Sequence, residues 1–562
     1  MSLFFAFSGD VKIGEGFGSP AATSLNSDGV KVPMVDPLFE EARFKGIRTS
    51  RVLPFAGKQA QEEASKKKLQ SKQSPLTRMQ NYAPIGEDPR RRPKFAMLAA
   101  ICLALMLCLV YPTKKPSSAT MSQATMSQDS SANLGQDHHP HLVTALPGLP
   151  EEYTAPMYAG FVDIAKKSSL FYWMFTAEEA PQQAPLVIWL NGGPGASSLT
   201  GALLENGPMR LDADGTTAYN EFGWTKEANV AFIDNPVGAG FSYTDNEDGY
   251  VNDLSEMAEQ LYTGIIEILE LHPWLAASPI YIAGESYAGK YIPAIAHYIY
   301  RRHEDGDTIV NLEGIMIGNG ETKPYIAYAS TPDYLFRMGY IDETQQRWAH
   351  KQLKVCKEQV EKEEYILAFE TCQKVEDDLF AKYVKLPFIY DLRAKSDVFT
   401  ELTAVMTDWI NQLDVRKALN VGERMWRQSD GQGPSSVGKP VPEHLKGDEM
   451  LDIPDEILQD LYENFRVLLF NGQFDGSSCN ALGTKRMLHE LDWVGKAAFE
   501  ATQQSAWSVK GGVAGYGKTG ISLNGEVTFL LVANSGHLVP SDQPENALDM
   551  LRRFINKEAF FD

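Results

Sequence analysis

Residues 281–293 read YIAGESYAGKYIP, and this stretch decides the fold that we predict for the chain. A β-branched, apolar run (279–282) leads into GESYAG (284–289), and a helical pattern follows. A strand, a tight turn and a helix in this order are typical of a nucleophile elbow, where small residues two positions before and after the serine allow a strained turn. Ala288 fills the second small position, so the G-x-S-x-G pattern is missed by one methyl group. Ser286 is a candidate nucleophile, and an ordinary strand-to-helix turn is the alternative.

The composition is that of a large, acidic, globular protein. The chain has 562 residues, of which 43% are hydrophobic, so it can bury a large core. A formal net charge of −21 argues against a nucleic-acid-binding protein. Five cysteines over this length exclude a disulfide-dense scaffold.

Short apolar runs recur from Leu146 onward, and helical patterns separate them. Continuous apolar runs of this kind are typical of parallel strands covered on both faces, so we predict an α/β protein with a central, mostly parallel sheet. The interval from about Tyr325 to Leu451 is helix-rich and charged, and we interpret it as a cap inserted over one end of the sheet. The expected strands are 185–190, 230–233, 279–283, 312–317, 467–470 and 527–532, and the expected helices include 254–271, 290–302, 347–364 and 370–384.

The N-terminal part of the chain differs from the rest in composition and in hydrophobic periodicity. Residues 1–94 show no sustained period and predict a disordered tail on the cytosolic side. An apolar run at 95–111 follows a basic cluster, which predicts an uncleaved transmembrane signal anchor over 95–112. A cleaved secretory signal peptide is the alternative, although a leader of about 90 residues is unusual.

Residues 113–145 are rich in Ser, Gln and Met and predict a flexible stalk. The stalk contains His138-His139-Pro140-His141, for which a metal-binding tract is the less favoured interpretation. The domain at 146–562 is then expected in the lumen of the secretory pathway, as part of a single-pass membrane protein of the lysosome, vacuole or Golgi. A secreted protein is the alternative.

A glycine-rich loop, WLNGGPGASS (189–198), follows the first expected strand. In an α/β-hydrolase, the oxyanion hole takes one backbone amide from such an early loop and one from the residue after the nucleophile. These would be the amides of Gly193 and Tyr287. A phosphate-binding loop is excluded because the Gly-Lys-Ser/Thr ending is missing.

An acid and a histidine complete the pattern. Asp475 lies just past an expected strand, and His537 lies in the loop after the last one. The order Ser286, Asp475, His537 is that of α/β-hydrolases, and each residue follows the carboxyl end of a strand, where such folds place their sites. The sequence therefore predicts an α/β-hydrolase fold with a central mostly parallel sheet, an inserted helical cap and a catalytic triad.

Five blocks of the sequence resemble the signature blocks of the serine carboxypeptidases, a family of acid-active lysosomal or vacuolar exopeptidases. The resemblance extends from about Leu146 to Phe560 and leaves residues 1–145 uncovered. The blocks are GESYAGKYIP (284–293), NGGPGASS (191–198), DNPVGAGFSY (234–243), IGNG (317–320) and GHLVPSDQP (536–544).

The resemblance implies that Ser286 attacks the peptide carbonyl, that His537 takes its proton and that Asp475 orients the imidazole. It also implies a hydrogen-bonded set that recognises the free C-terminal carboxylate of the substrate. Two glutamates beside a third carboxylate cannot all be ionised, so peptide binding is expected to weaken as pH rises. No cofactor or metal is expected. The carboxylate-binding set is Trp189, Asn191, Gly192, Glu205 and Glu285.

The substrate and the assembly are less constrained. Leu204 and Leu538 are expected to line the pocket for the departing residue, with Tyr325 or Tyr328 contributing, which favours apolar C-terminal residues. An acyltransferase on the same scaffold and a non-catalytic protective or scaffolding protein are the alternative functions. The family also contains dimers, so a homodimer is an open alternative to a monomer.

The cysteines depart from the family pattern. Ala196 stands where the family usually has a cysteine, so the disulfide expected there cannot form. One extra residue separates Asp475 from Cys479, which puts in doubt the family position of this cysteine. Cys356 and Cys372 both lie in the cap and can pair, leaving Cys479 free.

Overall fold

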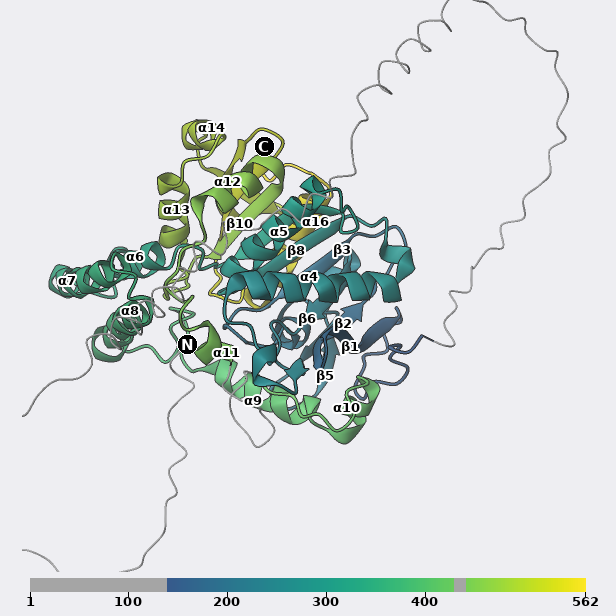
Figure 1. Ribbon diagram of the computed structural model, residues 1–562. Coiled ribbons are helices and arrows are strands. Elements are labelled where there is room, and N and C mark those ends of the chain that lie inside the picture. Colours follow the sequence, from purple (N-terminus) through teal and green to yellow (C-terminus); the bar gives the residue numbers. More distant parts are fainter. Residues whose placement is uncertain (1–138, 429–440, 562) are drawn as a thin grey trace, which may run out of the picture. The chain divides into compact units, whose positions relative to one another are not determined.

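The computed structural model describes residues 139–428 and 441–561 (Figure 1). Within them, an 11-stranded sheet has the order β1-β2-β6-β3-β8-β9-β10-β13-β12-β11, with β7 paired to β2, and β4 pairs with β5 in a small second sheet. The strands are β1 (Met157–Ala165), β2 (Ser168–Phe175), β3 (Leu186–Leu190), β4 (Met209–Leu211), β5 (Thr217–Tyr219), β6 (Asn229–Ile233), β7 (Tyr243–Thr244), β8 (Ile280–Glu285), β9 (Leu312–Gly318), β10 (Arg466–Gly472), β11 (Ser505–Val509), β12 (Gly512–Ile521) and β13 (Glu526–Val532).

The centre of the large sheet is parallel, and both of its edges are antiparallel. Neighbouring strands from β6 to β13 in the order above run parallel. At the edges, β1, β2, β12 and β11 pair antiparallel with their neighbours. All six expected strands are present. Three of them, β3, β6 and β8, are buried along their whole length, which explains why their sequences are continuously apolar. The predicted fold class is confirmed, with antiparallel edges that make the sheet mixed.

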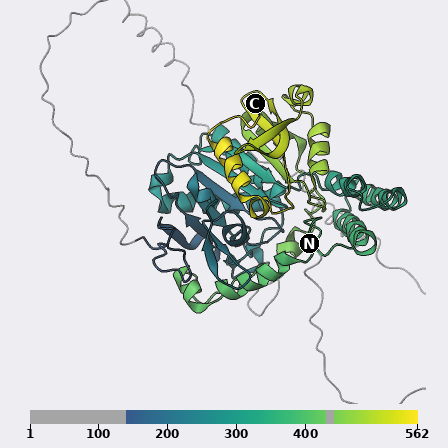
Figure 2. The same cartoon turned by 180° about the vertical axis from the view of Figure 1, so that it is seen from behind.

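Side chains of the central strands alternate between two hydrophobic clusters, one on each face. In β3, Leu186, Ile188 and Leu190 belong to the first cluster, and Val187 and Trp189 belong to the second. Helices complete both clusters (Figures 1 and 2). The first cluster includes residues of α4 (Leu254–Leu271), α5 (Ala288–Glu304), α12 (Asp455–Asn464), α13 (Ala481–Glu490) and α14 (Lys496–Ala501), and the second includes residues of α9 (Val398–Ile410), α10 (Leu413–Ala418), α15 (Val539–Asp542) and α16 (Pro544–Ile555).

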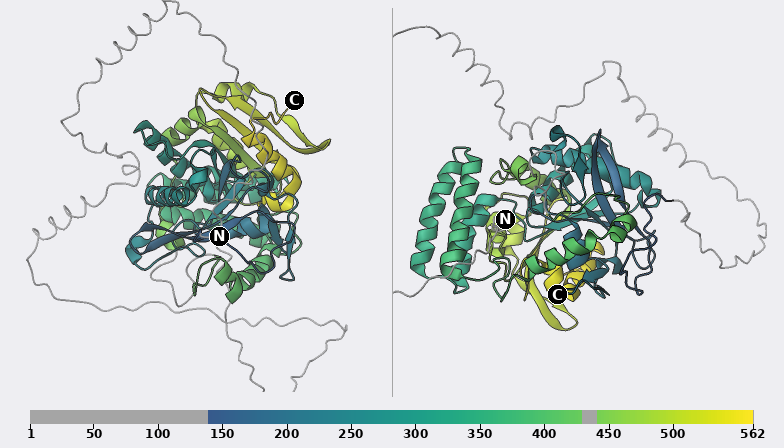
Figure 3. Two further views of the ribbon diagram at one scale, coloured as in Figure 1. Left: turned by 90° about the vertical axis from the view of Figure 1, so that its right-hand side faces the viewer. Right: turned by 90° about the horizontal axis from the view of Figure 1, so that it is seen from below.

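Between β9 and β10 the chain leaves the sheet and forms the helical cap. Its first three helices share a hydrophobic cluster of their own, and α7 and α8 lie side by side (Figure 3). Asp342 begins α7 with a capping box, because its side chain accepts hydrogen bonds from the amides of Thr344 and Gln345. The inserted segment lies between two neighbouring parallel strands of the sheet. It comprises α6 (Pro324–Arg337), α7 (Glu343–Val360), α8 (Tyr365–Leu379), η7 (Phe380–Val384), α9, α10 and α11 (Val441–Leu445).

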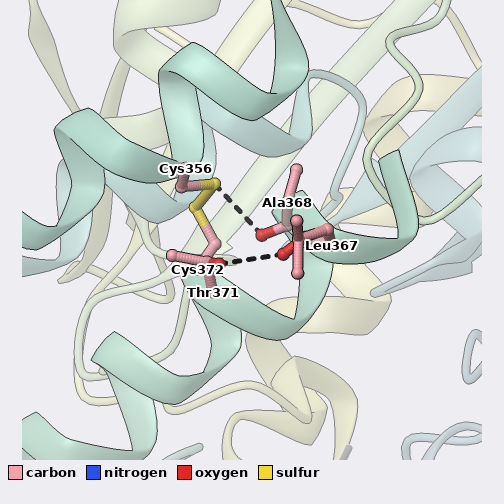
Figure 4. The surroundings of a disulfide bond; sticks show 5 residues. All are labelled: Cys356, Leu367, Ala368, Thr371 and Cys372. Carbon is pink, nitrogen blue, oxygen red and sulfur yellow. Dashed lines mark hydrogen bonds between the residues drawn. A yellow bond between two sulfur atoms is a disulfide. The ribbon is translucent and has the colours of Figure 1, made fainter. Parts of the chain in front are cut away.

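A disulfide joins the two cap helices α7 and α8 (Figure 4). Cys356 and Cys372 have Cα atoms 5.6 Å apart, and the Cys356 sulfur lies 3.2 Å from the Ala368 carbonyl oxygen. Cys479 is buried and free. The expected pairing is therefore confirmed.

Replacing Cys356 and Cys372 by serine is expected to lower the free energy of unfolding by about 3 kcal/mol, because the bond closes a loop of 16 residues in the unfolded chain. The urea midpoint of the double variant, followed by tryptophan fluorescence, measures this change. An unchanged midpoint would show that the bond does not constrain the unfolded chain.

The last part of the predicted stalk is structured. The amide of Val143 donates to the Met157 carbonyl (3.0 Å), and the amide of Ala159 donates to the His141 carbonyl (2.8 Å). His141 Nδ1 lies 2.9 Å from the Tyr172 hydroxyl. The stalk prediction is wrong for residues 139–145, because their backbone groups pair with β1. In the described part of the chain, no group of three or more histidine, cysteine or acidic side chains is arranged to hold a metal ion.

The predicted localisation is contradicted. Among residues 139–428 and 441–561, no helix combines the length and the apolar character needed to cross a membrane. A single-pass membrane protein is therefore not supported. The tail (1–94), the apolar run (95–111) and most of the stalk lie outside the described residues.

Candidate active site

Ser286 occupies the turn between β8 and α5, as the opening motif predicts. Its backbone has a φ of 64°, the strained left-handed conformation typical of a nucleophile elbow. Small neighbours are required here, because a Cβ on Gly284 would lie 2.1 Å from the Leu190 carbonyl oxygen. Ala288 fits in place of glycine because it is already the first residue of α5. Among the described residues, the Ser286 hydroxyl makes no hydrogen bond to His537.

Asp475 and His537 meet at the carboxyl ends of β10 and β13, which are adjacent and parallel. His537 Nδ1 lies 2.6 Å from Asp475 Oδ2, and the Asp475 side chain is fully buried. An ionised Asp475 only accepts hydrogen bonds, so Nδ1 carries the proton and Nε2 is left as a base. Tyr390 also holds His537 in place. The backbone amide of His537 donates to the Tyr390 carbonyl (2.8 Å), and the centroids of the His537 and Tyr390 rings are 4.7 Å apart.

Two residues that the sequence did not single out hold Asp475. Ser477 donates from its hydroxyl and its amide to Oδ1 (2.6 and 3.0 Å). Asn319, directly after β9, donates to Oδ2 (2.7 Å) and accepts from the amide of Gly472 (3.0 Å). Asn319 lies in the IGNG block and has a φ of 43°, and this block was its only signal in the sequence.

The glycine-rich loop lies directly on the elbow. A Cβ on Gly192 would be 2.4 Å from the Tyr287 amide nitrogen, so only glycine allows this approach. Gly193 has a φ of 114°, and the Tyr291 hydroxyl accepts from the amide of Gly195 (3.1 Å). The two amides predicted to bind the oxyanion, those of Gly193 and Tyr287, thus belong to segments in contact.

Asp234 anchors this loop, a role that the sequence did not reveal. Its Oδ1 accepts from the Ser197 hydroxyl (2.6 Å) and the Ser198 amide (3.0 Å), and its Oδ2 accepts from the Phe241 amide (2.8 Å). Burial raises the pKa of Asp234 to about 7, although these hydrogen bonds oppose the shift. A Cβ on Gly240 would lie 2.0 Å from Oδ2, which explains the glycine there.

The predicted carboxylate-binding residues come together around Asn191. Its Oδ1 accepts from the indole of Trp189 (2.9 Å) and from the Gly201 amide (3.1 Å). This fixes the amide orientation, so Nδ2 donates to Glu205 Oε1 (3.2 Å) and Glu285 Oε1 (3.0 Å). One asparagine therefore bridges two buried carboxyl groups.

The two carboxyl groups share a strongly perturbed titration. Burial raises the pKa of Glu205 to about 7, and hydrogen bonds from Asn191 and Glu285 oppose this. Burial raises the pKa of Glu285 well above its usual range, and the charge of Glu205 raises it further. Oε2 of Glu205 is buried and has no partner. The pair can therefore hold a proton at neutral pH and donate it to a third carboxylate.

Each of the two predicted pocket residues is the chain neighbour of a residue of the site. Leu204 is buried in η3 (Gly201–Glu205), next to Glu205, and Leu538 is half-buried next to His537. Tyr325 and Tyr328 lie on α6 and pack in the cap cluster.

An α/β-hydrolase fold with a buried acid–histidine pair beside a serine elbow defines a class of hydrolases. Within that class, residues 147–557 match the sequence model of the serine carboxypeptidase family. Venom serine carboxypeptidase of Apis mellifera is 35% identical over 412 residues, which cover 72% of this chain and 85% of the relative. The human protein described as probable serine carboxypeptidase CPVL is 33% identical over 426 residues, covering 74% and 85%.

The crystal structure of Kex1(delta)p, a prohormone-processing carboxypeptidase from Saccharomyces cerevisiae, shares the fold. The TM-score is 0.64 at 24% identity, and the match covers 74% of this chain and 96% of that one. The chain belongs to the serine carboxypeptidase family, and it is a serine-type carboxypeptidase, a hydrolase that acts on peptide bonds.

Proposed function

We propose that this carboxypeptidase is acid-active and uses Ser286, His537 and Asp475 as its catalytic triad, with Glu205 and Glu285 recognising the substrate carboxylate. The observation that carries the proposal is the buried glutamate pair, bridged by Asn191 and joined through Glu285 to the nucleophile elbow. This arrangement supports recognition of a free C-terminus beside the reacting serine.

Acylation begins when the Ser286 oxygen attacks the carbonyl carbon of the last peptide bond. Its proton passes to Nε2 of His537, and Asp475 stabilises the imidazolium through Nδ1. The amides of Gly193 and Tyr287 bind the oxyanion. His537 then gives the proton to the departing amine, the C–N bond breaks, and an ester to Ser286 remains. Water, deprotonated by His537, hydrolyses this ester and restores the hydroxyl.

The departing residue is oriented by its own carboxylate. A protonated member of the Glu205–Glu285 pair donates one hydrogen bond to it, and the Gly192 amide supplies a second donor. Trp189 acts indirectly: its indole holds Asn191, which bridges the two glutamates. We assign the side chain of this residue to the surface formed by Leu204 and Leu538. That surface favours apolar C-terminal residues.

The glutamate pair gives substrate binding a defined pH dependence. Because burial raises the pKa of Glu205 to about 7, the pair keeps its proton below that pH and loses it as pH rises through it. Two ionised glutamates repel the substrate carboxylate, so KM is expected to rise about tenfold per pH unit above this point. KM for an N-blocked dipeptide, measured with the full chain between about pH 4 and pH 8, tests this.

Two controls make the pH experiment specific. The dipeptide amide lacks the carboxylate and is expected to remain uncleaved throughout. The double variant Glu205→Gln, Glu285→Gln keeps neutral donors, so its KM is expected to be independent of pH, while Glu221→Gln at an exposed position behaves as wild type. Equal cleavage of acid and amide would exclude the proposed recognition of the carboxylate.

A further inference from the structure

Three histidine rings that the mechanism does not use gather beside β1. His139 and His141 belong to the first described segment, residues 139–142, and His272 follows α4. The rings of His139 and His272 are stacked, with centroids 4.5 Å apart and an interplanar angle of 14°, and the centroids of His139 and His141 are 6.0 Å apart. A Cβ on Gly160 would lie 2.6 Å from the His141 ring, so this ring lies directly on the backbone of β1.

Hydrogen bonds join the three rings to the domain. The Tyr172 hydroxyl on β2 lies 2.9 Å from His141 Nδ1 and 2.9 Å from His272 Nε2, so it links these two rings. His139 Nδ1 accepts from the amide of His141 (3.1 Å), and its Nε2 lies 3.1 Å from the Leu271 carbonyl oxygen. A ring that accepts at one nitrogen and donates at the other is neutral, so protonation of His139 would break the bond to Nδ1.

The surroundings of the rings disfavour a positive charge. The centroids of three aromatic rings lie 4.6 to 6.1 Å from that of His272, and they belong to Tyr158 on β1, Tyr172 on β2 and Trp274 after α4. Among the described residues, no carboxyl group acts on His141 or His272, and the charges that do come from histidines. Nδ1 of His272 is buried without a hydrogen-bond partner, so a proton added there would lack an acceptor.

These contacts hold only while the histidines are neutral. Burial, together with the charges of His139 and His141, lowers the pKa of His272 to about 3. Burial and the charge of His139 also lower the pKa of His141. A ring that becomes solvated regains a pKa of about 6.5 and binds a proton. Because the detached form binds more protons, attachment of the segment weakens as pH falls below about 6.5, by about tenfold per pH unit for each such histidine.

The segment can separate without disturbing the rest of the sheet. It lies along β1, the edge strand, where the amide of Ala159 donates to the His141 carbonyl (2.8 Å) and Leu142 forms a β-bridge. The next residue, Val143, is buried in the second hydrophobic cluster and keeps the chain attached. Opening of residues 139–142 is therefore a local event that requires no unfolding of the domain.

We propose that residues 139–142 form a clasp that holds the preceding chain against β1 and the end of α4 at neutral pH and opens in acid, when its histidines and His272 take up protons. Opening detaches the residues before 139 from the catalytic domain and frees the edge of β1 for pairing. Opening is measured without substrate, so its outcome does not depend on the proposed catalytic residues.

The test follows hydrogen exchange of the Ala159 amide in the full chain at about pH 7 and pH 5, by mass spectrometry with residue-level fragmentation. Dividing the rate for an unstructured peptide by the measured rate at each pH gives a protection factor, which removes the chemical effect of pH. In the wild type, this factor is expected to fall at least about 20-fold from the higher to the lower pH.

Two variants assign the fall to the histidines. His272→Gln keeps a side chain that can bond to the Tyr172 hydroxyl but cannot be protonated, and it is expected to reduce the fall at least about tenfold. The triple variant His139→Asn, His141→Asn, His272→Gln is expected to change its protection factor less than about twofold between the two pH values. His489→Gln, at an exposed position of α13, is the matched control and should keep the full fall.

Three outcomes would overturn the clasp. One is a protection factor of the Ala159 amide that is equal at both pH values in the wild type. Another is a fall that persists undiminished in His272→Gln and in the triple variant. The third is an equal loss of protection at the amide of Ile282 in β8, which would show that acid unfolds the whole domain.

Discussion

Ser286→Ala is expected to lower kcat by about 10⁶-fold, because the triad acts as a unit and loses its nucleophile. The fold should persist, since alanine removes only a hydroxyl that makes no hydrogen bond among the described residues and keeps the same backbone requirement at a φ of 64°. Release of the last residue from an N-blocked dipeptide measures the loss. A fluorophosphonate should label the wild-type chain on Ser286 and leave the variant unlabelled.

The matched control is Ser396→Ala, a serine on the cap surface, which should retain full activity. Labelling of a different serine, or residual activity above about 1% in Ser286→Ala, would show that the nucleophile lies elsewhere.

Asp475→Asn is expected to lower kcat by about 10⁴-fold with little change in KM. Asparagine preserves the size of the side chain, but its NH₂ group can face Nδ1 of His537 and stabilise the tautomer that protonates Nε2. Oδ2 of Asp475 already receives a hydrogen bond from Asn319 (2.7 Å), and a neutral amide offers weaker acceptors in this buried site.

The comparison that isolates this effect is Asp408→Asn at an exposed position of α9, which should behave as wild type. Thermal unfolding of both variants checks that the fold is retained. A rise in KM without a loss of kcat in Asp475→Asn would mean that Asp475 serves binding and not the orientation of His537.

The sequence predicts those parts of the fold whose cause is local. β3, β6 and β8 are buried on both faces, so their continuous apolar runs identify them as strands without knowledge of the neighbouring strands. β2 is equally buried, but it continues a hairpin with β1, and nothing local distinguishes an edge hairpin from an inner strand. Cys356 and Cys372 both lie in the cap, so the sequence allowed them to pair, and the structure shows the bond.

Contacts between distant segments explain what the sequence did not predict. Asn319 and Asp475 are 156 residues apart, and the bond between Ser197 and Asp234 joins two loops that follow different strands. The sequence blocks predict the triad, whereas the supporting residues are brought together only by the three-dimensional arrangement.

The parallel pairing of β10 with β13 has a practical consequence. Asp475 and His537 are brought together by this register, in which Gly472 pairs with Val532, while most of the 62 residues that separate them lead out to the sheet edge and back. The turn between β11 and β12 lies in this segment at the edge of the sheet, and a Cβ on Gly511 would meet no atom within 4 Å. A reporter group inserted after Lys510 would therefore leave turnover unaltered, which makes this turn a point of attachment for imaging or immobilising the active enzyme.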